Sequence, residues 1–227
     1  MLKNNYNKIK NFDLLKNRAF TLVELMVTIS IFLIITSVTI VNYSSFKSNV
    51  SLQNLTDDIA LSIRKAQSFA IGARAVDQDF NKSYGIHFSA DENTNGVDGS
   101  KNKSFLIFSV PKADITAGYT DKDICTVTLN CIELFKITST DKIKEISIVG
   151  GSNNGNDKNE SIDIIFTRPD PRARFCYTKS SGVGYGTVNC DSGISSASIV
   201  ISNGKTGDGE EKTKTITVQN TGQISIQ

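Results

Sequence analysis

Glu24 is the single charged residue of a long apolar run. From Phe20 to Val41 the chain has 22 residues without Pro, Gly, Lys or Arg. A helix of that length reaches roughly 33 Å, enough to cross the hydrocarbon core of a bilayer. Because a charged side chain at mid-membrane costs about 2.5 to 3.5 kcal/mol on insertion scales, an acid kept in such a segment indicates a function.

The segment before this run is basic. Residues 1–19 carry five basic side chains and one acid, Asp13, so this flank is expected to remain in the cytoplasm. Removing their net charge of +4 from a chain of net charge +2 would leave −2, which gives no overall basic balance for a nucleic-acid partner. A secretory signal cleaved near Ser37-Val38-Thr39, or a plain signal anchor, leaves Glu24 unexplained.

The sequence Ala19-Phe20-Thr21-Leu22-Val23-Glu24-Leu25 resembles the processing site of type IV pilins and of the pseudopilins of type II secretion. The resemblance implies that a prepilin peptidase cuts between Ala19 and Phe20 and that the new amino terminus, Phe20, is N-methylated. Ala19 stands where the family usually has Gly, and Ala is small enough for the same pocket. The resemblance also implies that Glu24 pairs with the amino terminus of a neighbouring subunit, because an ammonium and a carboxylate brought together in lipid offset each other's burial cost.

Apolar residues continue at helical spacing beyond the membrane run. They recur at intervals of three and four residues, as Leu52, Leu55, Ile59, Ile63, Ala66 and Ala70. We therefore predict one helix over about 21–74, in which residues 20–41 span the membrane and the amphipathic residues 42–74 pack on a head formed by residues 75–227. Tyr43 suits the membrane interface.

The head is expected to be rich in strands. Short, β-branched and mostly alternating segments occur at 83–88, 104–109, 132–137, 143–148, 161–166, 197–201 and 214–218. No helical pattern separates them, so we expect one α+β domain with antiparallel pairing. Residues 61–71, 84–88 and 216–226 resemble the H-type minor pseudopilins and the FimT-like minor pilins. This resemblance implies a helix packed on two antiparallel sheets, with a last strand after a turn at Gly222.

Four cysteines, Cys125, Cys131, Cys176 and Cys190, lie in the part expected to be exported. An oxidising compartment favours disulfides, and four cysteines allow three pairings. We expect Cys176 to pair with Cys190 because the glycine-rich segment between them can reverse the chain, which leaves Cys125 for Cys131. Zinc is the competing interpretation, but the chain has no Cys-x-x-Cys pair and one histidine.

Residues 91–98 match the first half of a calcium loop. Asp91, Asn93 and Asn95 place oxygen side chains at alternate positions before Gly96, whose freedom permits the sharp turn of such a loop. The bidentate acid that normally closes the loop is replaced by Asn102, and Asp98 is the candidate substitute. Calcium is the one cofactor that the sequence suggests, and a plain polar hairpin loop explains the same residues.

The densest basic patch of the head is formed by Arg168, Arg172, Arg174 and Lys179. FimT-like pilins can bind DNA through basic residues near the carboxyl end, but residues 222–227 contain neither Lys nor Arg. DNA binding would therefore depend on the segment from Arg168 to Lys179, for which a solvated loop is the competing interpretation.

The sequence favours a structural protein over an enzyme. His87 alternates with apolar neighbours and is expected to be a structural residue, and no phosphate-cradling glycine motif or nucleophile with partners is recognisable. The resemblance implies a single-pass inner-membrane subunit with its head outside the cytoplasm. Its expected role is to assemble into a type IV pilus or a secretion pseudopilus, at initiation or at the tip. The implied partners are other pilins, the prepilin peptidase and N-methyltransferase, and the assembly platform of the inner membrane. DNA uptake is the alternative.

Overall fold

The computed structural model describes residues 20–72, 74, 80–90, 101–112, 131–151, 158–179, 188–205 and 211–227. The chain divides into two compact units, Met1–Ser45 and Phe46–Gln227. One helix, α1 (Leu22–Ile71), contributes residues to both units. The predicted helix is confirmed, and it ends three residues before the expected position, where the amide of Gly72 donates to the carbonyl of Ser68.

In the second unit, one face of α1 is buried. Its buried residues include Leu52, Ile59, Ile63, Ala66 and Ala70, and Leu55 is partly buried beside them. Between them, Arg64 and the charged pair Asp57 and Asp58 are exposed. This is the amphipathic pattern predicted for the second half of the helix, and it places one apolar stripe against the head.

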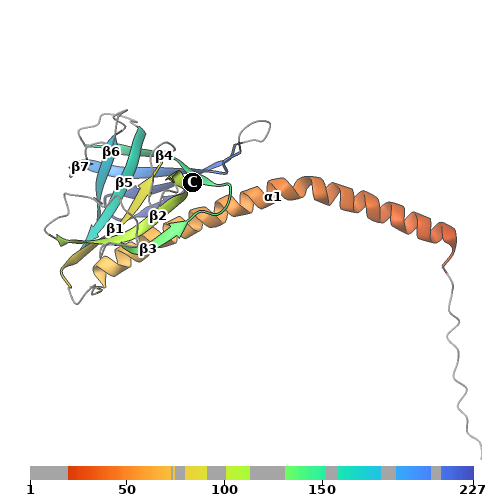
Figure 1. Cartoon of the computed structure of the whole chain (residues 1–227), viewed down its shortest axis with the longest axis horizontal. Coiled ribbons are helices and arrows are strands. Elements are labelled where there is room, and N and C mark those ends of the chain that lie inside the picture. The colour runs from red at the N-terminus through yellow and green to blue at the C-terminus, as the bar shows by residue number, and fades with distance from the viewer. Residues whose placement is uncertain are drawn as a thin grey trace, which may run out of the picture. The chain divides into compact units, whose positions relative to one another are not determined.

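The head consists of antiparallel strands. They are β1 (Lys82–Ser89), β2 (Ser104–Pro111), β3 (Cys131–Lys136), β4 (Lys142–Gly150), β5 (Lys158–Thr167), β6 (Asp170–Lys179), β7 (Val188–Asp191), β8 (Ile194–Ser202), β9 (Thr213–Gln219) and β10 (Ile224–Ile226). A short 3₁₀ helix, η2 (Lys101–Lys103), precedes β2. Figure 1 shows the strands gathered over the second half of α1, with β3 beside the helix.

The strands form two leaves that meet at β5. One leaf has the order β3-β2-β1-β5-β6-β7 and the other has the order β4-β8-β9-β10. Among the described residues, the hydrogen-bonded link between the leaves consists of two pairs, Ile146 with Asn159 and Ser147 with Lys158. The expected α+β architecture is therefore confirmed, and its two sheets are joined into one ten-stranded network at this short contact.

The first leaf is buried on both faces. Its inner face packs on α1 through residues such as Ile86, Ile107 and Ile164. Its outer face carries a second apolar cluster formed by Leu106, Phe108, Val110, Ile165 and Cys176. Gly85 lies under the ring of Phe108, and a Cβ added at Gly85 would lie 2.5 Å from the ring atom Cζ. A residue larger than glycine would thus force the ring to move.

The interpretation of the segment from Arg168 to Lys179 as a solvated loop is wrong, because residues 170–179 form β6. Ala173, Phe175 and Tyr177 are buried on one face, while Arg174 lies between them on the other. Two prolines and several charged residues make this alternation of buried and exposed positions hard to recognise in the sequence. The four-residue strand β7, which pairs with β6, was also not predicted.

The docking of α1 on the head can be tested with two residues that lie two positions apart. Ile63 is fully buried, whereas Leu61 has 65% of its surface exposed. Replacing Ile63 with Ala should lower the free energy of unfolding of the head by about 2 to 5 kcal/mol, because it leaves a cavity. Leu61→Ala should change it by about 0.5 kcal/mol or less. Denaturant unfolding followed by circular dichroism measures both, and equal effects would contradict this packing.

Candidate functional site

The amino-terminal end of α1 begins with a cap. The amide of Glu24 donates to Oγ1 of Thr21 at 3.2 Å, and the amide of Leu25 donates to the Thr21 carbonyl. Thr21 is therefore the N-cap residue, and Glu24 occupies the first turn, where its negative charge interacts favourably with the helix dipole. The Thr-x-x-Glu spacing could have predicted this start from the sequence.

Between Phe20 and Ile40 the large apolar side chains of the first unit are exposed. The stretch Leu22–Ile40 has a mean hydropathy of 2.2 and is long and apolar enough to cross a membrane. Its nineteen residues span about 29 Å as a helix. Water is a poor environment for so much exposed apolar surface, so the segment requires lipid or other apolar helices around it.

Four hydroxyl groups of this stretch are satisfied within the helix itself. Those of Thr28, Ser30, Thr36 and Thr39 each donate to a backbone carbonyl three or four residues earlier, at 2.7 to 2.9 Å. These bonds remove most of the cost of placing a hydroxyl in hydrocarbon. Glu24 differs, because within the described residues its exposed carboxylate has no ion-pair partner.

The second region with possible chemistry is a concave site of about 450 Å³. We call it the basic pocket and define it by its four cationic side chains, Lys112, Arg168, Arg172 and Arg174. Arg168 belongs to the two-residue turn between β5 and β6, Arg172 and Arg174 belong to β6, and Lys112 directly follows β2. The structure thus brings together three of the four basic residues noted in the sequence. The side chain of Lys179 lies outside the described part of the structure, and no pattern in the sequence indicated Lys112.

Two carboxylates accompany these cations. Asp170 accepts hydrogen bonds from the backbone amide of Arg172 at 3.0 Å and from its Nε at 2.6 Å. Both bonds lower the pKa of Asp170 below its ordinary value of 3.8, and the bond from the backbone amide makes the larger contribution. Asp191 accepts from the amide of Gly193 at 2.8 Å. Ala173, Phe175 and Ile194 supply the apolar part of the lining.

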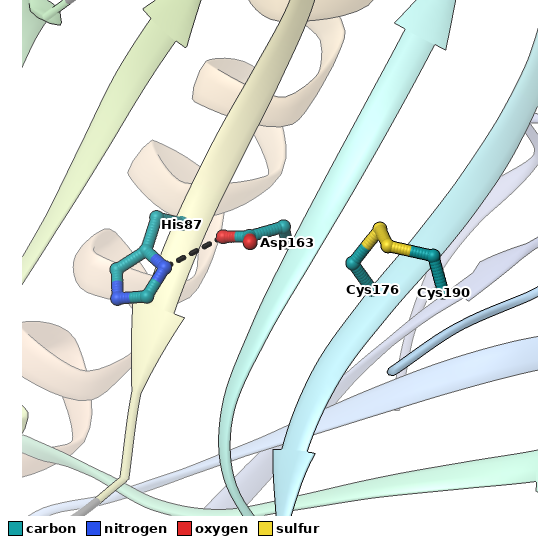
Figure 2. Close-up of a disulfide and its surroundings, with 4 residues drawn as sticks. All are labelled: His87, Asp163, Cys176 and Cys190. Atoms are coloured by element: carbon teal, nitrogen blue, oxygen red, sulfur yellow. Dashed lines mark hydrogen bonds and ion pairs between the residues drawn. A yellow bond between two sulfur atoms is a disulfide. The ribbon is translucent and has the colours of Figure 1, made fainter. Parts of the chain in front are cut away.

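His87 lies in a cross-strand row of paired residues. It pairs in register with Asp163, which pairs with Cys176, which pairs with Cys190, so the row crosses β1, β5, β6 and β7. Nδ1 of His87 lies 2.6 Å from Oδ1 of Asp163, and both side chains are mostly buried. Figure 2 shows this pair beside the disulfide that joins Cys176 to Cys190. The row ties the strands of the first leaf together, which is a structural role.

The other candidates are only partly described by the structure. Cys131 is disulfide-bonded, while its expected partner Cys125 lies outside the described residues. The suggested calcium ligands Asp91, Asn93, Asn95 and Asp98 also lie outside them. In the described part of the chain, no group of three or more His, Cys, Asp or Glu side chains is arranged to hold a metal ion.

Comparison with known proteins identifies the amino-terminal segment. Residues 14–40 match the family model of the prokaryotic N-terminal methylation motif. Neither the curated proteins nor the solved structures give a significant match. The matched residues include Ala19, Phe20 and Glu24, the positions on which the resemblance to pilins rests.

The chain therefore carries the amino-terminal methylation motif of the type IV pilin and pseudopilin family. A capped, apolar amino-terminal helix packed on antiparallel sheets agrees with that class of protein. The motif supports a type IV pilin-like subunit.

The contact between Asp170 and Arg172 predicts a pH response. The folded-state pKa of Asp170 is lowered, so its stabilising contribution is present above pH 3.8 and disappears as the pH falls through the lowered value. A carboxyl-carbon NMR titration should find the Asp170 midpoint below 3.8, and Arg172→Ala should raise it. Because alanine keeps the backbone amide, a midpoint that stays unchanged in this variant would contradict the contribution of the Arg172 side chain.

Proposed function

We propose that the chain is a minor pilin-like subunit that assembles into a membrane-based filament through α1. The observation that carries this proposal is the amino-terminal end of α1, where a matched methylation motif coincides with a fully exposed apolar helix that contains one acid. Such a helix supplies both a membrane anchor before assembly and an apolar surface for neighbouring helices afterwards.

In this proposal Glu24 sets the axial register between subunits. Cleavage between Ala19 and Phe20 would create a cationic amino terminus near the start of the helix. An isolated carboxylate in an apolar bundle is costly, and pairing it with the amino terminus of a neighbour offsets much of that cost. The pair forms only at one axial displacement of the two helices, so the cost of burying an unpaired charge disfavours other arrangements.

The orientation follows from charge and from redox chemistry. The five basic residues of the leader favour its retention in the cytoplasm. The disulfide between Cys176 and Cys190 suits a head on the oxidising side of the membrane. A bridge that closes a hairpin of this length contributes about 3 kcal/mol to stability.

Processing of the leader can be tested by mass. Intact-mass and peptide mass spectrometry of the protein from assembled filaments should find a chain that begins at Phe20 and carries one N-methyl group. Ala19→Lys should block this product, because the site before the cut accepts only a small side chain. Assembled protein that still begins at Met1 would contradict the proposal.

The role of Glu24 can be tested with a nearly isosteric neutral residue. Glu24→Gln should lower incorporation into filaments about tenfold or more, because the charge pair with the neighbouring amino terminus is lost. Membrane insertion should remain the same or improve. Glu133→Gln, which removes an acid from the ion pair with Lys65 on the head, serves as the matched control. Quantitative immunoblotting of sheared filaments against membranes gives the ratio, and normal incorporation of the Glu24 variant would exclude the pairing role.

DNA binding by the head is the second candidate function. The observation that favours it is the basic pocket, which gathers Arg168, Arg172 and Arg174 on one site with Lys112. The carboxyl-terminal strand β10 and the residues around it carry no cation that would extend the site. Binding to a nucleic-acid backbone gains strength from many phosphate contacts, so assembly remains the primary proposal.

A further inference from the structure

We propose that the basic pocket binds a compact dianionic oxyanion of the phosphate-monoester class. The site would be a second function of the head, separate from assembly through α1. Its wall is formed by segments far apart in the sequence: the end of β2, the β5–β6 hairpin, the β7–β8 turn and Asn220 after β9. These elements are held by the antiparallel pairing of the leaves and by a hydrogen bond from the amide of Ala173 to the carbonyl of Asn220 at 2.9 Å.

The pocket contains uncompensated positive charge. Within the described residues, the exposed guanidinium groups of Arg168 and Arg174 take part in no hydrogen bond or ion pair. The ammonium of Lys112 donates to the backbone carbonyl of Arg168 at 3.3 Å, a contact that leaves its charge unneutralised. Arg172 is the exception, because it is paired with Asp170.

The balance of charge fits a small dianion. Among the described residues, four cationic side chains and the two carboxylates of Asp170 and Asp191 line the pocket, which gives them a net charge of +2. A phosphate monoester carries between one and a half and two negative charges near neutral pH, roughly matching this balance. Guanidinium groups bind its oxygens in bidentate fashion, and Thr167, Ser192 and Asn220 add neutral polar groups to the same wall.

The same features disfavour a long polyanion. A nucleic-acid strand presents further phosphates on either side of any bound one, and affinity grows with the number neutralised. In the basic pocket, Asp170 and Asp191 line the same wall as the cationic side chains and would repel those additional phosphates. Ala173, Phe175 and Ile194, the apolar residues of the lining, are almost completely buried, so the contacts offered to a ligand come mainly from the polar and charged side chains.

Calorimetric titration of the full chain in nonionic detergent tests this proposal. The probes are inorganic phosphate, glucose 6-phosphate and a DNA duplex without terminal phosphate groups. All titrations use the same ionic strength, set with a chloride salt. We expect saturable one-to-one binding of inorganic phosphate and of glucose 6-phosphate. Arg168→Gln combined with Arg174→Gln should weaken phosphate binding about tenfold or more. Arg64→Gln, on the exposed face of α1, is the matched control and should leave it unchanged.

A gain in affinity provides a check that misfolding cannot imitate. Asp170→Asn removes a negative charge, and with it the ion pair that holds Arg172. The amide oxygen can still accept a hydrogen bond from the backbone amide of Arg172. The substitution should tighten phosphate binding about threefold or more. Phosphate binding no stronger than that of chloride, or equal losses in the Arg64 variant, would overturn the proposal. Competition in which the duplex displaces phosphate at lower concentration would assign the pocket to a polymer instead.

Discussion

The helix α1 lies in two different environments, and each half has the distribution of apolar residues that its environment requires. Over Leu22–Ile40 the helix is apolar on every side and none of it is buried within the protein. Over its second half the apolar residues keep to one stripe, which the strands cover. The first pattern requires lipid or other subunits, whereas the second requires only the chain's own head. A subunit with both patterns can be anchored and folded before it assembles.

The apolar environment of the first half of α1 matters most for its single acid near the amino terminus, Glu24. The hydroxyl groups of Thr28, Ser30, Thr36 and Thr39 donate to the helix backbone, so they need no partner on a neighbouring helix. The carboxylate of Glu24 cannot be satisfied in that way, because it only accepts hydrogen bonds and cannot donate to a backbone carbonyl, and its side chain is exposed. An unpaired carboxylate in an apolar environment is costly enough to select among arrangements of neighbouring helices.

The head supplies a stable frame for surface loops. Its first leaf has apolar layers on both faces, and the row from His87 through Asp163 to the Cys176–Cys190 disulfide crosses four of its strands. The β5–β6 turn that carries Arg168 joins two strands of this leaf. Rigid strands thereby fix where the cations of the basic pocket lie, although the side chains themselves are exposed.

Seven strands and the helix could be predicted from the sequence because their signals lie in contiguous residues: a period of two, a period of 3.6, or an unbroken apolar run. The strand β6 could not, since Pro169, Pro171 and three arginines in its neighbourhood are typical of a loop. Burial of Ala173, Phe175 and Tyr177 against the core outweighs that local preference. The helix start at Thr21 and the position of Glu24 needed no tertiary information.

The features of the amino-terminal end could therefore be predicted without the fold: an apolar helix, a basic flank and one acid, all within the first 41 residues. In contrast, the strand order of the head and the residues that meet on its surface depend on packing between distant segments. Lys112 and Arg168 are far apart in the chain, and they meet because β1 pairs with both β2 and β5. Such pairings depend on which apolar faces pack together across the whole domain, and no local pattern of residues specifies them.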